Sequence, residues 1–257
     1  MKPRLCPLLP MIVPLALLCL AAGPPDQALL PGERYRYEAV PLGAGDANRE
    51  SIEMEIREDR QGLRYRSRTR TPRGREEIEI EADPAGIVQS ARQTITGEHR
   101  SEGVTLRRKA GGIRLIGDRG ENAERTFAVP LGKTLAVDGS LLLLIRRFPF
   151  GQRAVSPLFM VDFSGASVTV ELSEAGLETV TVPAGTFACY RMEVTVDIPI
   201  LHPRLLYWVT KRPPHFLVRS VGKRGPFTPS YETTLVSAEP PPVSPPPAAD
   251  PAAQGNP

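Results

Sequence analysis

The sequence predicts a mainly β protein: a single curved antiparallel sheet, or a barrel or half-barrel, with one short helix and a disordered proline-rich tail. Three observations predict this class. From about Gly32 to Ser237, apolar and polar residues alternate with a period of two, which is typical of antiparallel strands with one buried face. Turn-forming residues recur about every eight to twelve residues. One run of leucines, 141–144, interrupts the alternation and indicates a helix.

Residues 1–22 have the features of a cleavable signal peptide. Lys2 and Arg4 supply positive charge, and the apolar run from Leu8 to Leu20 is followed by small residues, so we expect cleavage near Ala22. An uncleaved anchor is disfavoured because a spanning helix needs about 20 apolar residues, and this run is shorter and contains prolines. The sequence therefore predicts a periplasmic or secreted protein whose β-rich domain spans residues 33–237.

The first strands of this domain form a predicted meander. Apolar residues on one face of these strands alternate with charged ones: Ile52, Met54, Ile56, Tyr65, Ile78 and Ile80. Turns at Arg60-Gln61 and Arg73-Gly74 give the charged pairs Glu53–Arg68, Glu55–Arg66, Arg70–Glu77, Arg68–Glu79 and Arg66–Glu81. Alternating arginine and glutamate is typical of a solvated sheet face, and a polyanion site is the alternative.

The next segments bring a hairpin, a loop and the helix. Val104 to Leu115 turns through Ala110-Gly111-Gly112, and residues 118–130 are expected to form a charged loop. The leucines that follow form a predicted short helix, capped by Asp138 or Ser140 and with arginines in its last turn. Because leucines surround this helix on all sides, we expect it to be buried against the sheet, and a membrane-seeking segment is the alternative.

The remaining strands and the tail complete the chain. The predicted strands are 168–172, 177–182, 188–196, 205–211, 216–221 and 231–236, with a turn at Pro183-Ala184-Gly185. Residues 238–257 contain two triple-proline runs and little apolar bulk, so this tail cannot bury enough surface to fold. It is predicted to be disordered, either as a dispensable segment or as a polyproline II docking segment for a protein partner.

Several classes of site are excluded by their spacing. Gly132-Lys133-Thr134 lacks the first glycine of a P-loop, and Gly43-Ala44-Gly45 lacks the third glycine of a dinucleotide site. The three histidines share no metal-ligand spacing, and no Gly-x-Ser-x-Gly motif is present. Losing Lys2 and Arg4 would lower the formal net charge from +3 to +1, which disfavours nucleic acid as a partner. The sequence therefore predicts no catalytic residue, metal or cofactor.

The candidate ligand-binding residues are Tyr207, Trp208 and Arg219. Aromatic side chains with a polar group can line a pocket or can be part of the core. Tyr207 and Trp208 are neighbours on one predicted strand and must point to opposite faces. At most one of the two can therefore belong to a given pocket wall.

One family resemblance accompanies this pattern. The segments Val180-Thr181-Val182-Pro183-Ala184-Gly185-Thr186-Phe187, Leu206-Tyr207-Trp208-Val209-Thr210 and Leu217-Val218-Arg219-Ser220 resemble the exported proteobacterial family called domain of unknown function 3108, as does Asp138-Gly139-Ser140 with its following leucines. The resemblance implies a curved antiparallel sheet around a helix in an exported protein of unsettled biochemical role. It implies no catalytic residues.

Three functions follow from these expectations. The leading hypothesis is a non-enzymatic module that binds a lipid or other apolar or amphipathic envelope molecule in the concavity of its sheet. The alternative is a structural or protein-interaction component of the periplasm. The third is a hydrolase, which would require a serine, a histidine and a carboxylate within hydrogen-bonding reach in a cleft.

Overall fold

The computed structural model describes most of the predicted β-rich domain. The described residues are 32–43, 48–72, 74–97, 101–117, 124–197, 204–223 and 229–239. The predicted signal peptide, residues 1–22, lies outside the described residues, and so does the predicted tail except for its first two residues. These two, Ala238 and Glu239, extend the last strand beyond the predicted end of the domain.

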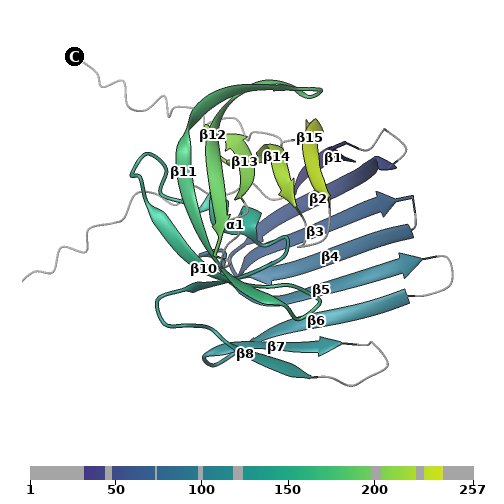
Figure 1. The fold of residues 1–257 in the computed structure, drawn as a ribbon, viewed down its shortest axis with the longest axis vertical. Helices are drawn as coiled ribbons and strands as arrows, with labels where there is room; N and C mark the ends of the chain where they lie inside the picture. The colour runs from purple at the N-terminus through teal and green to yellow at the C-terminus, as the bar shows by residue number, and fades with distance from the viewer. Residues whose placement is uncertain are drawn as a thin grey trace, which may run out of the picture.

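Fifteen strands and one short helix make up the described residues (Figure 1). The strands are β1 (Glu33–Pro41), β2 (Glu50–Asp59), β3 (Gly62–Thr71), β4 (Gly74–Ala82), β5 (Val88–Gly97), β6 (Ser101–Lys109), β7 (Gly112–Gly117), β8 (Arg125–Ala128), β9 (Thr134–Val137), β10 (Val155–Val161), β11 (Ser167–Val182), β12 (Gly185–Val196), β13 (Arg204–Thr210), β14 (Leu217–Lys223) and β15 (Ser230–Glu239). The helix α1 (Leu141–Arg146) lies between β9 and β10 in the chain.

All fifteen strands belong to one open, curved sheet. Its order is β8-β7-β6-β5-β4-β3-β2-β1-β15-β14-β13-β12-β11-β10-β9, so the first and last strands of the chain pair at its centre. Neighbours are antiparallel except β9 and β10, which run parallel because α1 connects them. Figure 1 shows the sheet continuing from β1 through β15, β14 and β13 and then curling round through β12, β11 and β10, with α1 in the curve. The predicted fold class is confirmed.

The predicted register of β2 and β3 is correct. Glu53 pairs with Arg68 and Glu55 pairs with Arg66, around a two-residue turn at Arg60-Gln61. The opposite face of these strands is buried, and Met54, Ile56 and Tyr65 belong to the core. Period-two alternation therefore places charge outside and apolar bulk inside, as expected for strands with one solvated face.

The predicted register of β3 and β4 is wrong by two residues. Arg66 pairs with Glu79, Arg68 with Glu77 and Arg70 with Arg75, because the turn ends with Thr71 opposite Gly74. A slip of two residues keeps every side chain on its face, so the buried face still gathers Ile78 and Ile80. Arg66 and Arg68 therefore still face glutamates of β4, but each faces a different glutamate from the predicted one.

The helix forms within the predicted segment and is buried as predicted, but its N-cap differs from the prediction. Ser140 occupies the N-cap position, but its hydroxyl bonds the backbone of Val137 instead of capping the helix. Gly139 precedes it with a φ of +84°, and an added Cβ there would lie 3.3 Å from a ring carbon of Tyr65. The helix is buried, with Leu143 and Ile145 fully covered. The positive φ of Gly139 favours glycine there, and a side chain at this position would crowd Tyr65.

Other strands lie where the sequence predicted none. Residues 118–130 were expected to form a loop, and β8 occupies Arg125–Ala128 at one edge of the sheet. At the other edge, β9 occupies Thr134–Val137. Both strands have four residues, which is too short for a clear alternation.

Candidate functional site

A cavity of about 200 Å³ lies between α1 and the concave face of the sheet. Its apolar wall comes from strands in both halves of the sheet and from the helix: Ile52, Met54, Leu142, Met160, Leu205 and Tyr207. Hydroxyl groups also line it, from Ser67, Thr69 and Thr233. Two acidic residues also line it, Glu76 and the exposed Asp138, and we call these two the charged rim. Lys223 borders the cavity at the end of β14, and its pairing with Ser230 puts its side chain on the outer face with Arg219.

Inward-facing positions of the strands supply this lining. Leu205 and Tyr207 are two residues apart on β13 and therefore share a face, as Ile52 and Met54 do on β2. Tyr37 of β1 lies beneath the cavity and donates a hydrogen bond of 3.1 Å from its hydroxyl to the carbonyl oxygen of Leu217. This bond ties β1 to β14 across β15, so it fixes the curvature at the base of the cavity.

Acidic groups of the rim act on a buried tyrosine. The pKa of Tyr65 is raised to about 12. Burial is the largest cause, and the carboxylates of Asp138 and Glu76 add to it, whereas a hydrogen bond with Ser67 lowers the pKa. The Tyr65 hydroxyl is therefore neutral at physiological pH. The Glu76 carboxylate also accepts a hydrogen bond from the side-chain amide of Gln93 on β5. This side of the cavity is thus acidic and already hydrogen-bonded.

The sequence-predicted site residues lie on two faces. Tyr207 lines the cavity, whereas Trp208 and Arg219 lie together on the opposite face, with the guanidinium carbon 5.0 Å from the indole ring centroid. Trp208 donates a hydrogen bond of 2.7 Å to Glu178, and Arg219 forms a 2.7 Å ion pair with Glu232. The pair of Trp208 and Arg219 is thus held between carboxylates on the outer face, apart from Tyr207.

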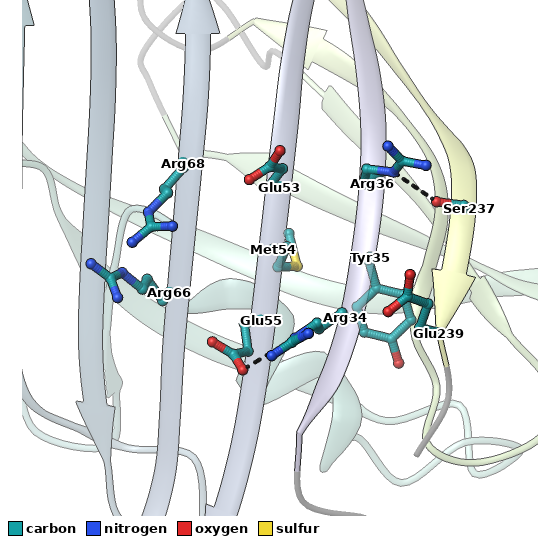
Figure 2. Close-up of a pocket in the computed structure, with 10 residues that line it drawn as sticks. All are labelled: Arg34, Tyr35, Arg36, Glu53, Met54, Glu55, Arg66, Arg68, Ser237 and Glu239. Carbon is teal, nitrogen blue, oxygen red and sulfur yellow. Dashed lines mark hydrogen bonds and ion pairs between the residues drawn. The ribbon is translucent and has the colours of Figure 1, made fainter. Parts of the chain in front are cut away.

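A second hollow, of about 420 Å³, lies on the outer face over β15, β1, β2 and β3 (Figure 2). Arginine and glutamate side chains line it, and the guanidinium of Arg34 lies 3.6 Å from the Glu55 carboxylate. Arg66 and Arg68 both bond the Glu77 carboxylate. Arg36 donates a hydrogen bond of 3.1 Å to the Ser237 hydroxyl. Because most of these cations are matched by carboxylates on solvated side chains, we interpret this surface as a set of exposed ion pairs.

Groups required for catalysis do not converge in the described residues. His215 is bonded through Nδ1 to the carbonyl oxygen of Thr210, at 2.8 Å, and its ring packs against Phe150. No serine hydroxyl bonds a histidine ring within the described part of the chain, and His99 and His202 lie outside it. Among the same residues, no group of three or more histidine, cysteine or acidic side chains could hold a metal ion. No described helix has the length and apolar character needed to span a membrane.

Sequence comparisons identify no relatives. No protein-family model matches this chain, and no curated protein matches it either.

Comparison of folds identifies several solved structures. One is the β-barrel-like protein of domain of unknown function 1849 from Brucella abortus, which has a TM-score of 0.59 and 12% identity and covers 82% of this chain and 98% of that chain. A protein of the domain of unknown function 1089 family from Pseudomonas aeruginosa has a TM-score of 0.41 and 12% identity and covers 65% of this chain and 87% of that chain. The hypothetical lipoprotein YmcC from Escherichia coli has a TM-score of 0.35 and 15% identity and covers 83% of this chain and 87% of that chain.

The Brucella likeness shows a shared fold. At 12% identity it extends to the fold alone. No family model matches this chain, so the resemblance to domain of unknown function 3108 stays a prediction. The chain therefore shares the overall fold of this solved β-barrel-like protein.

Proposed function

We propose that this protein is an exported, non-enzymatic envelope protein that holds the apolar part of an amphipathic molecule in the cavity beneath α1. The observation that supports this proposal is the composition of the cavity, an apolar wall with charged groups where it meets solvent. Ligand sites in proteins are typically apolar concavities with a few polar groups that set the orientation of the ligand. Curved β-sheets commonly enclose such ligands.

The size of the cavity limits what it can hold. A dry cavity of about 150 Å³ accommodates benzene, and sites for drug-sized ligands span roughly 300–1,000 Å³. At about 200 Å³, this cavity fits a short segment of an acyl chain with the rest of the molecule at the mouth. The flexible thioethers of Met54 and Met160 in its wall suit a chain of variable shape.

Displacement of an apolar fluorophore tests the proposal. We expect N-phenyl-1-naphthylamine to bind the full mature chain with increased emission, and a long-chain amphiphile to displace it. Met160→Trp fills the cavity and should abolish binding. The matched control, Leu177→Trp, adds the same ring at an exposed site on β11 and should bind as the parent does. Equal binding by both variants, with circular dichroism unchanged, would refute the proposal.

Extraction of the purified protein supplies the second readout. Mass spectrometry of an organic extract should detect a lipid or other amphiphile carried from the cell, and Met160→Trp protein should yield less of it than Leu177→Trp protein. An extract without amphiphile from protein that also fails to bind the fluorophore would contradict a carrier role.

Export rests on the features of residues 1–22 and has its own test. Expression with the native N-terminus in a Gram-negative host should give a periplasmic protein whose intact mass corresponds to cleavage near Ala22. Leu17→Arg places a charge in the apolar run and should block both processing and export. Full-length protein in the cytoplasm of cells that express the parent sequence would contradict this part of the proposal.

A further inference from the structure

The outer face of β5, β6 and β7 carries positive charge and no carboxylate. Alternate residues of these strands point outward, away from the face that buries Ala91, Val104 and Leu115. Arginine and threonine supply most of the outward positions: Arg92, Thr94, Thr96, Thr105, Arg107 and Arg114. Glu102, the acidic residue of these three strands, shares the inner face with Val104. This surface therefore differs from the outer face of β2–β4, where glutamate alternates with arginine.

Arginines without a carboxylate partner form a line across the outer face. Arg70 pairs with Arg75 between β3 and β4, Arg92 follows on β5, and Arg107 follows on β6. All four are exposed, and within the described residues none of these side chains makes an ion pair or hydrogen bond. We call these four residues the arginine diagonal.

The arginine diagonal is too long for one small anion. Arg75 faces Thr96 on β5, whereas Arg107 faces Ser90, so the diagonal runs along β5 from residue 96 to residue 90 while it crosses from β3 to β6. Strands lie about 4.8 Å apart and rise about 3.3 Å per residue, which gives a length of about 25 Å. A ligand that contacts all of these arginines must be extended.

The fold places like charges next to each other on this face. Arg70 lies directly opposite Arg75, and Arg107 lies directly opposite Arg114. Like charges directly opposite across two strands are destabilising. Arg114 has the Glu124 carboxylate as a partner, whereas Arg70, Arg75 and Arg107 have none within the described residues. An anion bound along the diagonal would relieve this repulsion.

The neighbours of the diagonal narrow the class of anion. Thr105 faces Arg92, Thr94 follows on the same face, and no hydrogen bond engages either hydroxyl within the described residues. Strands β5, β6 and β7 contain no aromatic residue, although single-stranded nucleic acids are typically bound by stacking on aromatic rings. A flat lipid surface would also approach exposed carboxylates such as Glu53 on β2. Cations in a line with hydroxyls between them favour a linear, hydroxylated polyanion.

We propose that the outer face of β3–β6 binds an acidic polysaccharide whose chain follows the arginine diagonal. The guanidinium groups bind the acidic groups of the polymer, and the threonine hydroxyls form hydrogen bonds with its sugar hydroxyls. This surface lies on the opposite side of the sheet from the cavity, so the inference does not depend on the proposed function.

Polygalacturonate is the probe, with neutral dextran as the control polymer. We expect the mature protein to bind polygalacturonate and not dextran, and to bind more weakly as the salt concentration rises, because screening weakens exposed ion pairs. Affinity should increase with the length of galacturonate oligomers until one chain spans the diagonal. No binding of polygalacturonate, or equal binding of dextran, would overturn the inference.

Charge-neutralising variants localise the surface. Arg92→Gln combined with Arg107→Gln should weaken polygalacturonate binding by about five- to thirty-fold, because two exposed ion pairs are lost. The matched control, Lys211→Gln combined with Arg212→Gln, removes the same charge from the exposed turn after β13 and should bind as the parent does. Both double variants should bind N-phenyl-1-naphthylamine as the parent does, which shows that the cavity is intact. Unchanged polygalacturonate binding by the double variant of Arg92 and Arg107 would overturn the inference.

Two further comparisons test the class of the polymer. Thr105→Val keeps the branched side chain but removes its hydroxyl, so it should weaken polygalacturonate binding about three-fold and leave the binding of inorganic polyphosphate unchanged. Thr105→Val protein that binds polygalacturonate as the parent does would contradict a role for the hydroxyls. Tighter binding of single-stranded DNA or of phosphatidylglycerol vesicles than of polygalacturonate, at equal total charge, would overturn the assignment to a polysaccharide.

Discussion

Arg146 of α1 and Glu33 at the start of β1 form a buried ion pair, with Nη2 and Oε2 2.6 Å apart and the two side chains 2% and 1% exposed. The Tyr35 hydroxyl donates a 2.6 Å hydrogen bond to the same Glu33 oxygen. This contact joins the last turn of the helix to the central strand of the sheet, across 113 residues of sequence. Because Leu142 of the same helix lines the cavity, the ion pair fixes one wall of the proposed binding site.

Breaking this ion pair is expected to destabilise the protein strongly. Arg146→Met leaves the Glu33 carboxylate buried without its cation, and we expect a loss of about 3–5 kcal/mol in the free energy of unfolding. The double variant Glu33→Leu with Arg146→Met removes both charges and should recover much of that loss. Urea denaturation followed by tryptophan fluorescence measures both. A single variant as stable as the parent would show that the pair does not hold the helix.

Glu77 on β4 should give a small, pH-dependent contribution to stability. Burial alone would raise the pKa of Glu77, but hydrogen bonds from Arg66 and Arg68 outweigh it and lower the pKa. A carboxylate with a lower pKa in the folded state stabilises that state at neutral pH and loses this effect as the pH falls through the unfolded and then the folded pKa. Glu77→Gln should therefore cost up to about 1 kcal/mol at pH 7.

Denaturation at several pH values tests the sign of this effect. The stability difference between parent and Glu77→Gln protein should shrink as the pH falls below about 4.3, the ordinary value for glutamate. Glu53→Gln is the matched control, because Glu53 lies on the same outer face, on β2, whereas the hydrogen bonds of Arg66 and Arg68 go to Glu77. A difference between parent and Glu77→Gln that grows toward low pH would contradict the account.

Cys189 on β12 is expected to be unreactive in the folded protein. Its side chain is fully buried, and burial, with the nearby Glu178 carboxylate, raises the pKa of the thiol to about 11. Since the thiolate is the reactive form, native protein at pH 8 should react with an aromatic disulfide reagent far more slowly than protein unfolded in guanidinium chloride. Fast labelling of the native protein would indicate an accessible, activated thiol instead.

The sequence predicts most reliably those features that local pattern determines. The β2–β3 hairpin was predicted in its correct register because a two-residue turn, the charged pairs and the apolar face all agree on one alignment. The β3–β4 hairpin was displaced by two residues because Glu77, Glu79 and Glu81 satisfy the arginines in either alignment. Turn geometry at Thr71 and Gly74 decides between the two alignments, and the charge pattern does not contain that information.

Features that depend on distant contacts were not predictable in the same way. The arginines at the end of α1 were predicted from the local sequence, because cations stabilise the C-terminus of a helix. Nothing in that local sequence indicates that Arg146 forms an ion pair with Glu33. Tyr207 was a predicted site residue and does line the cavity. Met54, Leu142 and Met160 join it there from separate elements, so only the curvature of the sheet shows that they share a wall.

Methionine-methyl NMR of the mature protein with bound laurate tests the central claim most directly. Met1 and Met11 lie in the predicted signal peptide, so three methionines remain, of which Met54 and Met160 line the cavity and Met192 is a fully buried core residue outside its lining. The account predicts intermolecular Overhauser contacts from the laurate chain to the methyl groups of Met54 and Met160. Contacts absent from both methyl groups, with laurate demonstrably bound, would contradict it.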